Sequence, residues 1–85
     1  MRFSKNAWAQ LKNKTTDELI SALLKDGFVL DDKVRAERIY RRGDGKRVSI
    51  HYHSGDRTYG PALLKSLLED IGWSEAEMKK LKLIR

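Results

Sequence analysis

The pattern that most constrains the fold is an alternation of apolar and polar residues on both sides of Gly43-Asp44-Gly45. Residues 34–42 and 47–53 alternate in this way, which predicts two β-strands with unlike faces. The glycines predict a three-residue hairpin loop, with Gly45 at the position that requires a positive φ angle. This loop sets the register of the two strands. The expected cross-strand partners are Tyr40 and Val48, Arg38 and Ile50, Glu37 and His51, and Arg35 and His53.

The register also assigns each side chain to one face of the hairpin, because successive residues of a strand point to opposite sides. We expect one face to pack on helices, and it carries Ala36, Tyr40, Val48, Ile50 and Tyr52. We expect the other face to be open to solvent, and it carries Glu37, Ile39, Arg41, Arg47, Ser49, His51 and His53. An acid, two imidazoles and two guanidiniums are therefore expected on one surface.

The rest of the chain reads as helices and one more strand. Ser4 can cap a short helix to Leu11, and the Thr15 and Glu18 capping-box pattern opens a helix over about residues 16–26. Residues 28–30 are expected as a short strand that Asp31-Asp32 ends. A third helix is expected over 61–71 and a short fourth one after Ser74.

These elements predict an α+β fold, in which a three-stranded antiparallel sheet packs on helices in α-β-β-β-α order. Short extra helices are expected at both ends. We expect residues 1–14 to form an N-terminal helical arm and residues 15–85 to form one domain.

The positive charge is concentrated on the hairpin. The chain has a net charge of +6, and between Lys33 and Arg47 lie seven Lys or Arg against only Glu37 and Asp44. Such clustering indicates a polyanionic partner, and RNA is the expected one. The candidate phosphate contacts are Arg35, Arg41, Arg42, Lys46 and Arg57.

The chain has no cysteine, and no apolar run approaches the roughly 20 residues of a membrane span. We therefore expect a cytoplasmic protein without a membrane partner.

The open face also predicts a chemistry. Metal-free RNA cleavage needs a base for the 2′-OH proton, an acid for the leaving 5′-oxygen, and cations that stabilise the phosphorane. The candidate catalytic residues are Glu37, His51, His53 and Arg47. The alternative is an ordinary cross-strand pair on a solvated sheet face. His51 and His53 could also hold a metal ion with Glu37 or Asp56, but two ligands do not make a site, so we expect no metal and no cofactor.

Four segments carry a resemblance to a known family. They are Leu24-Lys25-Asp26-Gly27-Phe28, Asp44-Gly45-Lys46-Arg47, Val48-Ser49-Ile50-His51-Tyr52-His53-Ser54-Gly55, and the run from Tyr59-Gly60-Pro61 to Ile71-Gly72. Residues 16–83 resemble the HicA family of toxins from type II toxin-antitoxin systems. The resemblance implies a double-stranded-RNA-binding-domain-like fold. It also implies an endoribonuclease (mRNA interferase) that cleaves mRNA, inhibits translation and is neutralised by a HicB-type antitoxin.

The resemblance also bears on the candidate catalytic residues. It places Arg35-Ala36-Glu37 on the Gly-Ser-His motif that carries the family's catalytic histidine, so Glu37 takes the place of that histidine. His53 matches a histidine that many members have at the end of the next strand.

Three classes of function stay open at this point. The chain is an RNA-cleaving toxin, an RNA-binding module of the same fold without catalysis, or a protein-interaction domain that docks an acidic partner.

Overall fold

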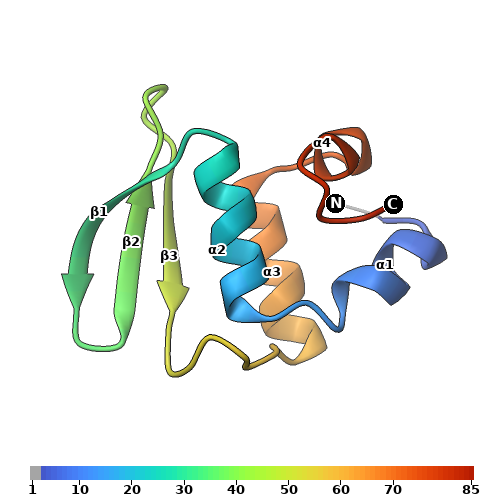
Figure 1. Cartoon of the computed structure of the whole chain (residues 1–85), viewed down its shortest axis with the longest axis horizontal. Coiled ribbons are helices and arrows are strands. Elements are labelled where there is room, and N and C mark those ends of the chain that lie inside the picture. Colours follow the sequence, from blue (N-terminus) through green and yellow to red (C-terminus); the bar gives the residue numbers. More distant parts are fainter. Residues whose placement is uncertain (1–2) are drawn as a thin grey trace.

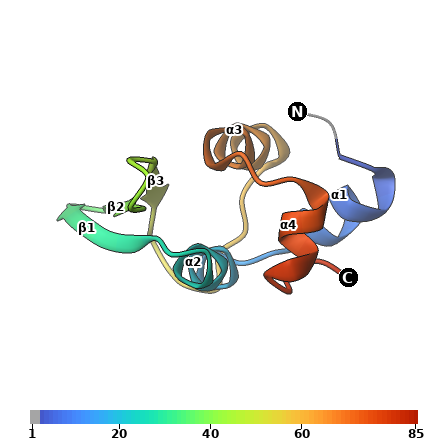
Figure 2. The same cartoon turned by 90° about the horizontal axis from the view of Figure 1, so that it is seen from above.

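The computed structural model describes residues 3–85 and confirms an α+β fold with a three-stranded antiparallel sheet (Figure 1). The elements are α1 (Lys5–Leu11), α2 (Thr16–Lys25), β1 (Val29–Val34), β2 (Glu37–Arg41), β3 (Arg47–His51), α3 (Pro61–Ile71) and α4 (Glu75–Lys80). The strand order in the sheet is β1-β2-β3. Figures 1 and 2 show α2 and α3 between the sheet and the two short helices α1 and α4. Within residues 3–85, no helix is long and apolar enough to span a lipid bilayer.

One hydrophobic core joins all of these layers. It includes Leu19 and Leu23 of α2, Tyr40, Val48 and Ile50 of the sheet, Leu64, Leu68 and Ile71 of α3, and Met78 of α4. Ala7 and Leu11 of α1 are 2% and 0% exposed in the same cluster, so α1 extends the core. The Glu75 carboxylate also accepts hydrogen bonds from the backbone N–H and the hydroxyl of Ser4, which joins the starts of α1 and α4.

The start of α2 anchors the loop that follows β3. The first N–H groups of a helix lack partners inside the helix. The Thr16 N–H donates to the Arg57 carbonyl at 2.9 Å, and the Asp17 N–H donates to the Gly55 carbonyl at 3.0 Å. Thr15 and Glu18 form the expected capping box. Residues 52–60 are therefore held against α2 by backbone hydrogen bonds.

The predicted extents of the first two strands are wrong. β1 does not end at Asp31-Asp32 but continues to Val34, because a bulge between Leu30 and Asp32 absorbs one residue of the register. The chain then reverses at Arg35-Ala36, with Arg35 at a φ of 56°. Arg35 therefore lies in a turn and does not pair with His53, which lies beyond the end of β3.

The register of the central hairpin is confirmed. Glu37 pairs with His51, Arg38 with Ile50 and Tyr40 with Val48, and Gly45 has a φ of 90°. Tyr40, Val48 and Ile50 are buried against the helices. Arg38 shares this face, and its guanidinium stacks on the Tyr52 ring, with Cζ 3.7 Å from the ring centroid.

Candidate active site

The centre of the candidate site is the pair Glu37 and His51, which lie directly opposite each other on β2 and β3. The backbone N–H of Tyr52 donates to the Ala36 carbonyl at 2.6 Å, so these two residues form a hydrogen-bonded pair. Hydrogen-bonded and non-hydrogen-bonded pairs alternate along an antiparallel ladder. The next pair, Glu37 and His51, is therefore a non-hydrogen-bonded pair with Cα atoms about 4.5 Å apart. Both side chains are exposed on the open face. The two side chains therefore start from adjacent backbone positions on one face of the sheet.

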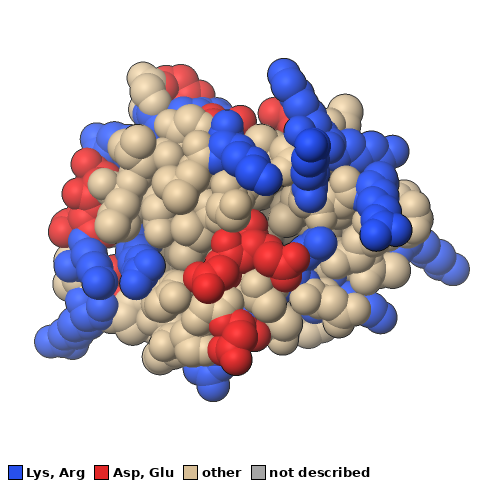
Figure 3. All heavy atoms as spheres, viewed as in Figure 1, with Lys and Arg blue, Asp and Glu red and all other residues tan. Residues whose placement is uncertain are grey.

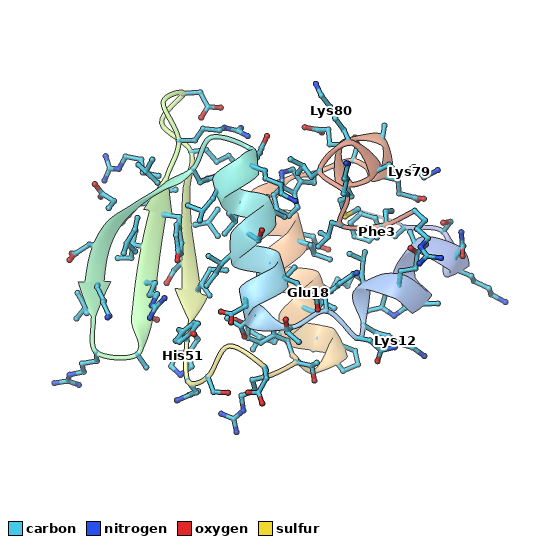
Figure 4. All side chains as sticks on the ribbon, viewed as in Figure 1. Phe3, Lys12, Glu18, His51, Lys79 and Lys80 are labelled. Carbon is cyan, nitrogen blue, oxygen red and sulfur yellow. The ribbon has the colours of Figure 1, made fainter. Side chains whose placement is uncertain are left out.

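His53 lies beside this pair, as the sequence predicts, although it is outside β3. Its ring packs edge-on against the His51 ring, with centroids 4.3 Å apart. The Tyr59 hydroxyl donates to the His51 backbone carbonyl at 3.1 Å, which ties the end of β3 to the loop before α3. The two imidazoles therefore lie together at the end of the sheet where Figure 4 shows His51.

A groove runs along the open face beside α3. A hollow of about 340 Å³ is lined by Glu37, Ser49, His51, Tyr59, Leu63 and Leu67. A second hollow of about 350 Å³ is lined by Glu37, Ile39, Arg47, Ser49 and Asp70. Because they share Glu37 and Ser49, the two hollows form one depression, which we call the α3 groove. The candidate acid–base pair therefore faces a concave surface that is large enough for part of a ligand.

Arg47 lies in the α3 groove but not at the Glu37–His51 pair. It is the partner of Arg41, and four residues along each strand separate the two pairs. At about 3.4 Å per residue, this places the two pairs about 14 Å apart along the strand. The Arg41 guanidinium is neutralised by Asp31 at 3.1 Å, whereas Arg47 forms no ion pair within residues 3–85. Arg47 thus places a positive charge in the α3 groove, away from the pair.

Two of the predicted phosphate contacts lie at the far end of the sheet. The Arg42 guanidinium donates to Asp26 at 2.6 Å and to Asp44 at 2.8 and 3.0 Å. These hydrogen bonds, with Asp44 the largest contribution, raise the pKa of Arg42. The hydrogen bonds from Arg42 and then from the Lys46 N–H lower the pKa of the Asp44 carboxyl to about 2. The Lys46 ammonium lies against Gly72 at the end of α3. Arg35 lies in the turn before β2, which begins at Glu37. Arg57 lies in the loop after β3, which ends at His51.

The charge of the open face is more balanced than the sequence suggests. The pairing of β1 with β2 places Asp32 opposite Ile39, and the Asp31 carboxylate reaches Arg41, so both acids share the face with Glu37, Arg41 and Arg47. Many cations lie instead on the helical side, where Lys14, Lys25 and Lys82 line one depression. Figure 3 shows Lys and Arg side chains over the end of the molecule that carries α1 and α4, and Figure 4 shows Lys12, Lys79 and Lys80 there, far from the sheet.

Leu63 and Leu67 line the groove, although the sequence analysis identified neither as a site residue. Leu64, Leu68 and Ile71 are buried, whereas Leu63, on the same helix, is 55% exposed and lines the groove. The sequence holds no signal that separates Leu63 and Leu67 from the core residues. The apolar residues at positions 63, 64, 67, 68 and 71 span an arc of the helix no wider than an ordinary core-facing stripe.

A family model described as the HicA toxin of bacterial toxin-antitoxin systems matches residues 16–73, which is more than half of the chain. The chain belongs to the HicA toxin family. It is therefore related to the toxins of toxin-antitoxin systems, and membership implies an antitoxin partner in general. No curated protein matches the chain. The match covers the sheet, α2, α3 and the groove, and it leaves α1 and α4 outside.

Within residues 3–85, no three His, Cys, Asp or Glu side chains gather closely enough to hold a metal ion. Glu37 and His51 lie opposite each other on the sheet, and the His53 ring contacts the His51 ring. A carboxylate and an imidazole can each accept or donate a proton, so these side chains are suited to acid–base chemistry.

Proposed function

We propose that the chain is a HicA-type endoribonuclease (mRNA interferase) that cleaves mRNA and inhibits translation. The observation that carries this proposal is the non-hydrogen-bonded cross-strand pair of Glu37 and His51, which faces the α3 groove. Glu37 replaces the family's histidine as a proton acceptor, and His51 supplies the second proton-transfer group. The RNA enters along the open face, and the proposed location is the cytoplasm.

The proposed reaction is an internal transesterification. Glu37 accepts the 2′-OH proton while the 2′-oxygen attacks the adjacent phosphorus. The bond from phosphorus to the 5′-oxygen then breaks, and protonated His51 gives its proton to that oxygen. The products are a 2′,3′-cyclic phosphate and a free 5′-OH. His53, as the nearest imidazole, stabilises the charge of the phosphorane.

Phosphate binding is proposed for the cations around this pair. Arg47 contacts a neighbouring phosphate along the groove, and Arg35, Arg41 and Arg57 lie on the exposed surface where further phosphates pass. Arg42 and Lys46 lie at the opposite end of the hairpin, next to the turn between β2 and β3. They therefore contact only an RNA that is long enough to reach this end of the sheet. A HicB-type antitoxin is the proposed partner, which neutralises the toxin by covering the groove.

The test is cleavage of a long single-stranded RNA by the purified protein in EDTA. Glu37→Gln and His51→Ala should each reduce the rate by about 100-fold or more, because a positioned acid or base contributes that much. Asp32→Asn is the matched control, since it removes an exposed carboxylate of the same sheet that does not line the groove. Circular dichroism of each variant should match the parent. If Glu37→Gln retains full activity, the proposal is wrong.

A second candidate function is RNA binding without cleavage. The glutamate at the position of the family's histidine favours it, because a carboxylate cannot donate a proton in its ionised form. In that case the protein binds RNA with an affinity that falls as salt rises, with a slope of about −0.7 per phosphate contacted, and leaves the strand intact. Absent or salt-independent RNA binding would favour a domain that docks an acidic protein instead.

A further inference from the structure

The α3 wall of the groove is apolar, although the strands that face it are polar. Tyr59, Leu63 and Leu67 line the same hollow as Glu37 and His51. Leu67 is nearly buried, but Leu63 is 55% exposed and contributes little to the core. Single exposed leucines are common on protein surfaces. Here, however, the exposed leucine forms a continuous wall with a half-buried tyrosine directly beside the candidate acid–base pair.

We propose that Tyr59, Leu63 and Leu67 form a base pocket, which binds an unpaired nucleobase next to the phosphate at Glu37 and His51. This inference rests on the proposed function and names its substrate class, which is single-stranded RNA. It also assigns sequence preference to α3 and to the loop before it, outside the sheet residues that carry the chemistry.

The size and chemistry of the hollow suit this occupant. Its volume of about 340 Å³ lies at the lower end of the range for small-ligand sites. A hollow of this size is too small for a strand or a helix of a partner protein. A nucleobase has apolar faces and polar edges. The leucines and the tyrosine ring offer an apolar contact for a face, and the Ser49 hydroxyl and Glu37 carboxylate offer hydrogen-bonding groups for an edge.

The structure also fixes the wall relative to the pair. The Tyr59 hydroxyl bond to the His51 carbonyl holds the tyrosine at the end of β3. Leu63 lies in the first turn of α3, which packs against β3. A base in this pocket would therefore be placed at a constant distance from His51. In a duplex the base is stacked and its pairing edge is occupied, so only an unpaired base can enter.

The experiment measures binding to a short single-stranded 2′-O-methyl oligonucleotide and to an abasic strand of the same length. The methyl group blocks the attacking oxygen, so cleavage plays no part in the result. We expect the parent protein to bind the strand with bases about tenfold more tightly than the abasic strand, the effect of one stacked base. Leu63→Ala should remove most of this difference and leave binding of the abasic strand unchanged.

One variant serves as the control. Leu24→Ala removes a leucine of α2 that is 52% exposed and does not line the groove, so it should behave as the parent. The inference is overturned if the parent binds both strands equally, if a duplex of the same sequence binds as tightly as the single strand, or if Leu63→Ala and Leu24→Ala have the same effect.

The outcomes for this inference and for the proposed function are separate. Base-dependent binding together with intact native RNA would contradict cleavage but support the pocket. Cleavage of native RNA together with base-independent binding would support the nuclease and contradict the pocket.

Discussion

The Arg42 guanidinium donates to Asp26 Oδ2 at 2.6 Å and so joins the end of β2 to the end of α2. The same oxygen accepts a hydrogen bond at 2.8 Å from the indole N–H of Trp73, which is 1% exposed. An arginine that the sequence assigns to an RNA surface therefore takes part in a structural cluster that connects the sheet, α2 and the segment after α3.

This cluster makes Asp26 important for stability. Asp26→Ala leaves the buried Trp73 N–H without an acceptor, which should lower the free energy of unfolding by about 1–3 kcal/mol. The measurement is urea denaturation followed by tryptophan fluorescence. Asp32→Ala, at an exposed position of β1, should change the free energy of unfolding by less than about 0.5 kcal/mol. Equal effects of the two substitutions would show that the cluster does not stabilise the fold.

Asp44 should make the stability of the protein depend on pH in the acid range. Its pKa is about 2 in the folded protein, below the ordinary value of 3.8, because Arg42 and the Lys46 N–H donate to it. A lowered pKa stabilises the fold above about pH 4, and this contribution disappears as the pH falls through about 2. Asp44→Asn should therefore be less stable than the parent at pH 7, and the gap should close between about pH 4 and pH 2. Thermal unfolding measured across this range checks the prediction, which a gap independent of pH would contradict.

Arg35 has a positive φ angle, which is common for glycine and rare for other residues. Its φ of 56° lies in the left-handed region, which costs a residue with a Cβ about 1–2 kcal/mol. Glycine avoids this cost but loses about 0.5–1 kcal/mol through the greater entropy of the unfolded chain. Arg35→Gly should therefore raise the free energy of unfolding by about 0.5–1 kcal/mol. Urea denaturation measures this effect, and Arg35→Ala, which keeps the strain, should show no gain. A loss of stability in Arg35→Gly would mean that the arginine side chain stabilises the turn by more than the strain costs.

The proposed base can be exchanged for the residue type that the family carries. Glu37→His places an imidazole opposite His51, and an imidazole can accept the 2′-OH proton as a carboxylate does. We expect this variant to cleave RNA and to lose activity on acidification at a higher pH than the parent, because an imidazole binds its proton at higher pH than a carboxyl. The pH–rate profile on a single RNA measures the shift. An unchanged acidic limb would exclude residue 37 as the base.

Local patterns predicted the parts of this structure that depend on neighbouring residues. The Thr15–Glu18 and Ser74–Glu77 capping boxes open helices as expected, and Gly45 sets the register that places Glu37 opposite His51. The extent of β1 was missed because Asp31-Asp32 is typical of a strand end. The bulge that carries the strand past these residues is stabilised by β2, and a local pattern contains no information about that partner.

The sequence by itself determined the fold class, the hairpin register and the presence of an acid and two imidazoles on one face, because each follows from side-chain periodicity and turn chemistry over a few residues. Only the tertiary structure decided that Arg42 pairs with Asp26, that Arg47 lies about 14 Å along the strand from the pair, and that α3 lines the groove with Leu63. These relations join residues that are far apart in the chain. They depend on how the helices pack against the sheet, which only the long-range contacts of the folded chain determine.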